Sequence, residues 1–194
     1  MNTWQDELRR GNFRARELHG ENYEQEKNII LEWVCGQLDN ILEIGCGEFP
    51  LFNDSTKIDV AKVRNDIIQI DCNQPFADKL GKKFSVIIAQ YVVCHLWNIE
   101  DFFDECHKLL QDVSYLILSL PNENYWRRRL NFSKQTEEML WHIDNKTYWR
   151  LNPASLKIIA ERHGFMVEDI RPIGRSSSLT ISASMLAKLR KVSK

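Results

Sequence analysis

A pair of glycines separated by one residue closes the first strongly apolar run of the chain. Gly45 and Gly47 lie in the segment ILEIGCGEFP, residues 41–50. A glycine has no Cβ, so a ligand can approach its backbone closely. In an open parallel sheet, ligands bind outside the carboxyl ends of the strands. The pattern therefore predicts a ligand-binding turn directly after a strand, and two nucleotide-like ligands compete for it.

The first of these ligands is a dinucleotide, and the sequence disfavours it. A dinucleotide fingerprint needs a third glycine three residues after the second, and then a helix whose amino end holds the pyrophosphate. Pro50 stands at that position. Only nine residues, 49–57, separate Glu48 from the apolar Ile58 of the next expected strand, which is too few for a full crossover helix.

The second ligand is S-adenosylmethionine, and acidic residues stand where it needs them. An acid at the end of the second strand would accept hydrogen bonds from both ribose hydroxyls, and a polar side chain after the third would meet the adenine. Asp59 and Asp71 occupy these two places. Glu43 precedes the glycine turn, where it either orients the loop or meets the ligand's ammonium group. Taken singly, Asp59 and Asp71 are also typical of turns that close strands, and Glu43 of an ion pair.

Short runs rich in Ile and Val must position these residues, because such runs suit strands covered on both faces. Helical spacing of apolar residues predicts a helix over residues 23–38 and a crossover helix over residues 99–110. A third helix is expected after Asn152 as N-cap and Pro153, with Gly164 just past its end. Alternation predicts an edge strand over 165–170, and the tail fits either a strand over 178–184 or a helix over 179–192. The remaining strands are expected at residues 40–44, 56–60, 66–70, 84–89 and 115–120.

The composition fits one soluble domain over residues 1–194, with 43% hydrophobic and 27% charged residues. A net charge of -1 lacks the broad basic footprint of a general nucleic-acid binder. The five cysteines are odd in number and never spaced C-x-x-C, which favours reduced thiols. The first residues show no apolar signal region, and no apolar run approaches the ~20 residues of a membrane span. We therefore expect a cytoplasmic protein without membrane contact.

Five segments together resemble successive motifs of the class I S-adenosylmethionine-dependent methyltransferases, and among them the small type 11 group. The resemblance covers roughly residues 25–170, and its segments are ILEIGCGE, KIDV, IIQIDCNQPF, FSVIIAQYVVCHL and LILSLPNE. It implies an α/β fold: a doubly wound, mostly parallel, seven-stranded Rossmann-like sheet with helices on both faces. Residues 121–150, rich in aromatic side chains, would form a cap over the carboxyl edge of that sheet.

The resemblance also assigns roles to the site residues. Gly45, Cys46 and Gly47 would wrap the methionine moiety, and Asp59 would hold the ribose. The other cofactor contacts would be Asp71 and Cys72 beside the adenine, the loop from Gln90 beneath the methionine end, and Glu43. Cys46 and Cys72 are expected to line the pocket rather than act as nucleophiles. Phe49 stands where the family often has a third glycine, which leaves a non-catalytic S-adenosylmethionine-binding or regulatory protein as the alternative.

Methyl transfer mainly requires alignment of an acceptor with the methyl group, and a general base only when the acceptor must lose a proton. His95 is the candidate base, although a histidine that bonds the backbone at a helix start is the more common case. The pairs Cys94-His95 and Cys106-His107 suggest zinc, but adjacent ligands rarely converge on one tetrahedral ion, so no metal site is expected.

The acceptor is expected to be a small molecule. Tyr91, Tyr125, Trp126 and Arg127 are the candidate acceptor contacts, the last three within the segment NYWRRRLN. Aromatic and guanidinium groups in alternation can also stack on bases and pair phosphates, so an RNA or protein methyltransferase is a second alternative. The asparagine-proline-proline-aromatic motif of adenine or glutamine methylation is absent after the fourth strand, where residues 90–93 read QYVV.

Overall fold

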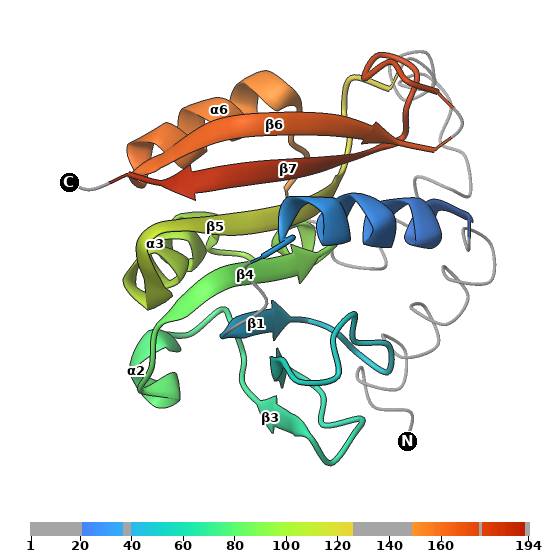
Figure 1. Cartoon of the computed structure of the whole chain (residues 1–194). Helices are drawn as coiled ribbons and strands as arrows, with labels where there is room; N and C mark the ends of the chain where they lie inside the picture. The colour runs from blue at the N-terminus through green and yellow to red at the C-terminus, as the bar shows by residue number, and fades with distance from the viewer. Residues whose placement is uncertain (1–20, 37–39, 126–148, 175, 193–194) are drawn as a thin grey trace, which may run out of the picture.

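The computed structural model describes residues 21–36, 40–125, 149–174 and 176–192 (Figure 1). Within this part of the chain, seven strands form one sheet in the order β3-β2-β1-β4-β5-β7-β6. Most of the expected cap, residues 126–148, lies outside the described residues. Trp126 and Arg127 lie outside them as well.

Five strands of the sheet run parallel, from β3 to β5 in the spatial order. Strand β7 (Ser184–Lys191) pairs antiparallel with β5 and with the edge strand β6 (Phe165–Ile173). The chain leaves β1 toward β2 and β3 on one side and returns to β4 on the other, so the strand order reverses between β1 and β4. The parallel strands are β1 (Ile41–Ile44), β2 (Thr56–Asp59), β3 (Ile67–Gln69), β4 (Phe84–Gln90) and β5 (Leu110–Pro121).

Helices cover both faces of the sheet, as expected. Residues 21–33 are helical and bury Ile30 and Trp33 with Val86 and Ile88 of β4 in one apolar cluster. The alternate β4 residue Ile87 belongs to the larger cluster on the opposite face, which also contains α3 and α6 residues. The α/β prediction is therefore confirmed. The remaining helices are α2 (Ala77–Leu80), the 3-10 turn η1 (Val93–His95), α3 (Ile99–Leu109) and α6 (Pro153–Arg162).

Most of the predicted elements are found within a few residues of their expected bounds. The Asn152 side chain accepts a hydrogen bond from the Ser155 amide and closes a capping box at the start of α6. Gly164 follows α6 with a φ of 79°. No helix connects β1 to β2 over residues 45–55, in agreement with the short spacing.

The tail was predicted incorrectly. Both the helix over 179–192 and the strand over 178–184 are wrong, because the strand of the tail begins only at Ser184. Residues 178–181 instead turn, and the Ile181 amide donates to the Ser178 carbonyl at 3.0 Å. Strand β7 lies between β5 and β6, so two hydrogen-bonded ladders stabilise an extended backbone there despite the helical spacing of its apolar residues.

Candidate cofactor and acceptor site

The glycine turn lies at the switch point of the sheet, where the strand order reverses between β1 and β4, and it contacts the loop that follows β4. Gly45 and Gly47 have φ values of 67° and 55°, in the left-handed region that favours glycine. The Gly45 amide donates to the Ile58 carbonyl at 2.8 Å, which ties the turn to β2. A Cβ on Gly45 would overlap Cγ2 of Val92. The turn therefore needs glycine both for its backbone and for its contact with the post-β4 loop.

Asp59 ends β2 beside this turn. Its Oδ2 accepts from the Gly47 amide at 3.0 Å, and its Oδ1 accepts from the Ala61 amide at 2.9 Å. Burial raises the pKa of Asp59, although these amide hydrogen bonds oppose the shift. Each carboxylate oxygen can accept a second hydrogen bond. This geometry fits two ribose hydroxyls, and the ribose role itself stays a prediction.

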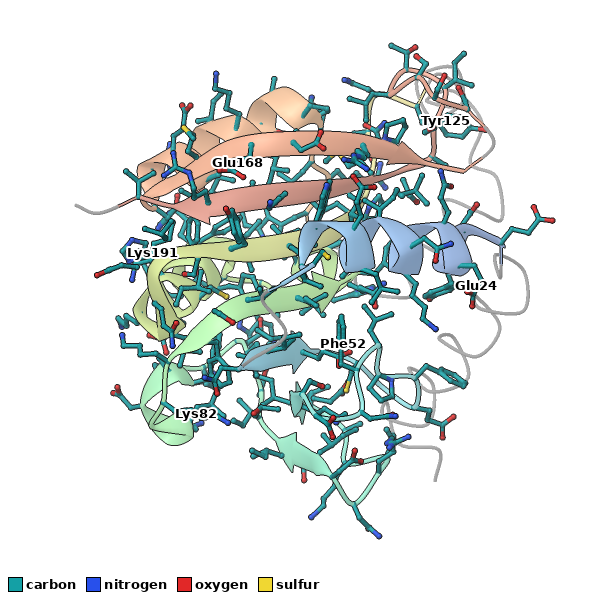
Figure 2. The ribbon with its side chains drawn as sticks, viewed as in Figure 1. Glu24, Phe52, Lys82, Tyr125, Glu168 and Lys191 are labelled. Carbon is teal, nitrogen blue, oxygen red and sulfur yellow. The ribbon has the colours of Figure 1, made fainter. Side chains whose placement is uncertain are left out.

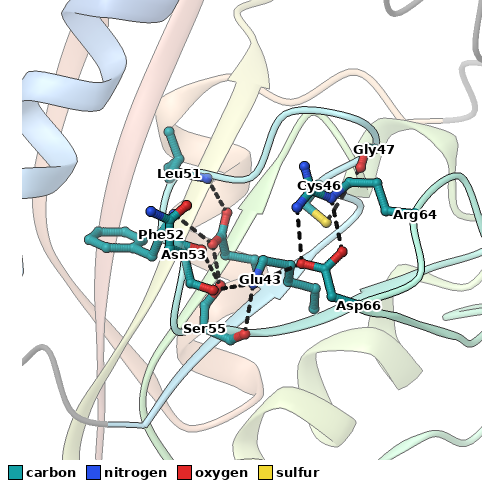
Figure 3. A network of polar contacts seen from close by, with 10 residues as sticks. Glu43, Cys46, Gly47, Leu51, Phe52, Asn53, Ser55, Arg64 and Asp66 are labelled. Carbon is teal, nitrogen blue, oxygen red and sulfur yellow. Dashed lines mark hydrogen bonds and ion pairs between the residues drawn. The ribbon is translucent and has the colours of Figure 1, made fainter.

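Glu43 orients the loop between β1 and β2, the first of its two predicted roles (Figure 3). The side chain is buried, at 3% exposure. Its Oε2 accepts from the Leu51 amide at 2.6 Å, and its Oε1 accepts from the Phe52 amide at 3.0 Å and the Ser55 hydroxyl at 2.5 Å. A buried carboxylate thus holds the residues that replace the missing helix, and Phe52 packs beneath the N-terminal helix (Figure 2).

Lys57, in β2, also stabilises the loop between β1 and β2. The ammonium donates to the carbonyls of Asn53 at 2.7 Å and Ser55 at 3.0 Å, and it pairs with Asp66 at 3.4 Å. Arg64 shares that carboxylate (Figure 3). Within the described residues the alternative for Glu43, an ion pair, is not found: its partners are two amides and a hydroxyl, whereas Lys57 pairs with Asp66.

Asp71 and Cys72 follow β3, as the adenine prediction requires. Asp71 Oδ1 accepts from the backbone amide of Asn73 at 2.9 Å and from its side-chain amide at 3.0 Å, an Asx turn. The Asn73 side-chain oxygen in turn accepts from the Trp97 amide at 2.9 Å, which ties this loop to the segment after η1. The contacts seen are those of a turn residue, and the adenine contact stays a prediction.

Neither pocket cysteine has the character of a nucleophile. Burial raises the pKa of the Cys46 thiol to about 12, with Glu43 and Asp59 adding to the shift. Burial raises the pKa of the Cys72 thiol to about 12 as well, followed by the charge of Asp71. Both thiols are therefore protonated at neutral pH, which agrees with the expectation that neither is a nucleophile, and their pocket-lining role stays a prediction.

Residues near the carboxyl ends of β4 and β5 bind a carboxylate that sequence reasoning missed. Glu26, on the N-terminal helix, is 1% exposed. It accepts hydrogen bonds from the Tyr91 hydroxyl at 2.5 Å, the Gln90 amide at 2.9 Å and the Ser119 hydroxyl at 3.0 Å. These donors lie 64 to 93 residues away along the chain, and Glu26 stands in a polar helical segment, so no local pattern distinguished it.

Tyr91, directly after β4, has an unusual backbone conformation. Its φ is 54°, a left-handed conformation that costs a non-glycine residue on the order of 1 kcal/mol and often marks functional loops. The Tyr91 amide donates to the Ser119 carbonyl at 3.0 Å. Burial and the neighbouring Glu26 raise the pKa of the Tyr91 hydroxyl well above its ordinary value. Tyr91 is therefore a hydrogen-bond donor to Glu26.

His95 ends the η1 turn, and its amide donates to the Val92 carbonyl at 2.9 Å. Its role as a base stays a prediction. Tyr125 closes a turn in which its amide donates to the Asn122 carbonyl at 3.2 Å, at the border of the described residues.

No group of three or more His, Cys, Asp or Glu residues within the described ranges is placed to hold a metal ion. The described helices are also too short or too polar to cross a membrane.

Comparison with known proteins assigns the chain to a family. A family model for a methyltransferase domain matches residues 13–170. A protein of Mycolicibacterium smegmatis, described as a probable S-adenosylmethionine-dependent methyltransferase, is 27% identical over 67% of this chain and 53% of its own length. The chain thus spans about half the length of that relative.

Two solved structures share the fold at low identity. A possible histamine N-methyltransferase from Thermotoga maritima matches with a TM-score of 0.69 and 15% identity, over 94% of this chain and 95% of the other. The magnesium protoporphyrin IX methyltransferase of Synechocystis, solved with S-adenosylhomocysteine bound, matches with a TM-score of 0.56 and 14% identity, over 88% and 84% of the two chains. The chain belongs to the methyltransferase-domain family, and its fold is that of the class I enzymes whose cofactor is S-adenosylmethionine.

Proposed function

We propose that this protein transfers a methyl group from S-adenosylmethionine to a small-molecule acceptor. One observation carries the proposal: the glycine turn after β1, the carboxylate of Asp59 after β2 and the loop after β4 meet at the switch point of the sheet. Ligands bind at such a point in open α/β sheets. A Cβ at Gly45 would overlap Cγ2 of Val92, so glycine at this position lets the turn contact the post-β4 loop.

Each residue of the site then has a defined task. Asp59 would hold the ribose hydroxyls, Gly45 and Gly47 would admit the methionine moiety, and Asp71 would border the adenine. The cofactor supplies a methyl group already activated on a sulfonium, so the protein has to align the acceptor and exclude water. His95 is the proposed base for an acceptor that must lose a proton.

Phe49 bears on the non-catalytic alternative. Its side chain is 37% exposed, so the ring that replaces a third glycine is not buried in the core around the turn. The Phe49 amide donates to the Cys46 carbonyl at 3.1 Å, which continues the turn. This arrangement favours an active enzyme over a regulatory protein that only binds the cofactor. The near-neutral charge favours a small molecule over RNA.

We also propose a cytoplasmic location and a single domain with residues 121–150 as its cap. All five cysteines are free, which supports a reducing compartment. The single seven-stranded sheet contains β5, which leads into the cap segment, and β6 and β7, which follow it. The first residues of the segment are bonded to the same domain, since the Asn122 amide donates to the Ala183 carbonyl at 2.8 Å and the Glu123 amide to the Leu151 carbonyl at 3.1 Å.

Calorimetry with S-adenosylmethionine and S-adenosylhomocysteine tests the cofactor site. We expect both ligands to bind wild-type protein and Asp59→Asn to lose at least about tenfold in affinity, since charged hydrogen bonds contribute about 1.5–3 kcal/mol. Asp78→Asn is the matched control, because it makes the same charge change on the exposed first turn of α2. Absence of binding to wild-type protein at millimolar ligand contradicts the proposal, and equal affinity of the two variants contradicts the role of Asp59.

A further inference from the structure

Glu26 is a buried carboxyl group, and the described part of the chain places no cation beside it. Its three hydrogen-bond donors, Tyr91, Gln90 and Ser119, are all neutral. Removing a carboxylate from water costs several kcal/mol, and neutral donors offset only part of that cost. Burial accordingly raises the pKa of Glu26 above its ordinary value, although its three hydrogen bonds oppose the shift. A cation brought beside this carboxyl group in a low-dielectric region would strongly stabilise its charged form.

Two aromatic rings lie beside this carboxylate. Tyr23 precedes Glu26 by three residues on the same helix, so both side chains share one helix face. The centroids of the Tyr23 and Tyr91 rings lie 6.5 Å apart with an interplanar angle of 61°. Both tyrosines are partly exposed, whereas Glu26 behind them is buried. Aromatic faces attract organic cations, and tilted pairs of rings are used to recognise substituted ammonium groups.

The cluster adjoins the proposed site. Gln90 ends β4 and Tyr91 follows it, and the next residue, Val92, contacts Gly45 of the glycine turn. The strained backbone of Tyr91 places its hydroxyl on Glu26 while its amide stays bonded to Ser119 of β5. The cluster therefore stands at the carboxyl edge of the sheet, next to where the cofactor is proposed to bind.

We propose that Glu26, together with the rings of Tyr23 and Tyr91, forms a binding site for an organic cation. This inference rests on the proposed function and names the chemistry of its ligand. The same onium chemistry has two sources in a methyl-transfer reaction: the ammonium group of an amine acceptor, or the sulfonium of the cofactor. The first source makes the enzyme a methyltransferase of amines that bind in their ammonium form. The ammonium would first lose a proton to the proposed base His95. The nitrogen lone pair would then form the bond to the methyl carbon as the bond from that carbon to the sulfonium sulfur breaks, which leaves S-adenosylhomocysteine.

The first measurement compares the binding of an onium compound with that of an uncharged compound of the same shape. Choline and its carbon isostere 3,3-dimethylbutan-1-ol are titrated, with S-adenosylhomocysteine bound, and followed by NMR shifts of the tyrosine rings. We expect saturable choline binding and at least tenfold weaker binding of the isostere. Glu26→Gln should weaken choline binding at least tenfold, and Tyr23→Leu a few-fold, since a cation-ring contact contributes about 0.5–1 kcal/mol at a partly exposed site.

Glu32→Gln is the matched control because it removes the same charge from an exposed position of the same helix, where Glu32 pairs with Arg171 at 2.8 Å. It should leave choline binding unchanged. Denaturant unfolding shows whether each variant is folded. If Glu26→Gln does not fold, Tyr23→Leu still tests the site, because it leaves the Glu26 hydrogen bonds intact.

The second measurement identifies the source of the cation. Calorimetry compares the affinities for S-adenosylmethionine and for the neutral S-adenosylhomocysteine in wild-type and Glu26→Gln protein. A sulfonium source predicts that the ratio of the two affinities falls about tenfold in the variant, whereas an ammonium source leaves it unchanged. The inference is wrong if choline binding does not depend on Glu26 and this ratio is also unchanged. Failure of both cofactor ligands to bind wild-type protein would instead contradict the proposed function.

Discussion

Substitution of Gly45 by alanine tests the contact that joins the cofactor turn to the post-β4 loop. The new Cβ meets two separate penalties. A left-handed backbone, here with φ 67°, costs alanine about 1–2 kcal/mol. Overlap with Val92 Cγ2 forces the core to adjust, which typically costs about 1–3 kcal/mol. We therefore expect Gly45→Ala to lower the free energy of unfolding by about 2–5 kcal/mol in total.

A second glycine separates the two penalties. Gly81 has a φ of 60°, and a Cβ there would meet nothing within 4 Å. Gly81→Ala therefore incurs only the backbone penalty of about 1–2 kcal/mol. Val92→Ala removes the overlapping methyl group, so the double variant Gly45→Ala/Val92→Ala should recover part of the loss. Such a cycle isolates the pairwise term between neighbouring residues.

The assay is urea unfolding of the four proteins and wild type, with calorimetric titration of S-adenosylhomocysteine in each folded variant. Gly45→Ala should also weaken S-adenosylhomocysteine binding, whereas Gly81→Ala should not, because Gly81 lies at the end of α2. The reasoning is refuted if Gly45→Ala and Gly81→Ala are equally destabilised, or if Val92→Ala gives no recovery.

Two further predictions concern the loop between β1 and β2 and the thiols of the site. Glu43→Gln loses charged hydrogen bonds to Leu51, Phe52 and Ser55, so it should destabilise the protein by about 1–3 kcal/mol in urea unfolding and weaken S-adenosylhomocysteine binding; unchanged values for both would disprove the loop-holding role. With pKa values near 12, Cys46 and Cys72 should resist alkylation by iodoacetamide at pH 8 in native protein, while the exposed Cys35 reacts. Mass spectrometry after proteolysis measures this, and alkylation of Cys46 as fast as that of Cys35 would contradict the burial of its thiol.

The loop between β1 and β2 shows how one position controls the architecture of this site. The eleven residues 45–55 are too few for a crossover helix between two parallel strands, so the loop amides lack helical partners. Glu43 supplies two acceptor oxygens to this loop, and Lys57 supplies donors for two of its carbonyls. Of the two roles that the sequence allowed for Glu43, its contacts are those of the residue that orients the loop.

Local patterns were sufficient for the parallel sheet and the residues at its strand ends. The Ile- and Val-rich runs, the glycine pair and the capping signal at Asn152 all depend on neighbours within a few residues, so their spacing predicted β1 to β5 and the start of α6. Asp59 is placed by β2, which it ends, and Asp71 by β3, which it follows. The tail failed because its apolar spacing fits a helix, and only pairing with both β5 and β6 makes it a strand.

Tertiary structure alone decided what the carboxylates do. The sequence by itself determined the fold class and a ligand-binding edge, because strand and turn preferences are local. The contacts of Glu43 with loop amides, and those of Glu26 with residues 64 to 93 positions away, arise when distant strand ends and a helix come together. A buried carboxylate must accept hydrogen bonds, and the donors near it come from residues that are distant in sequence and meet only in the folded chain.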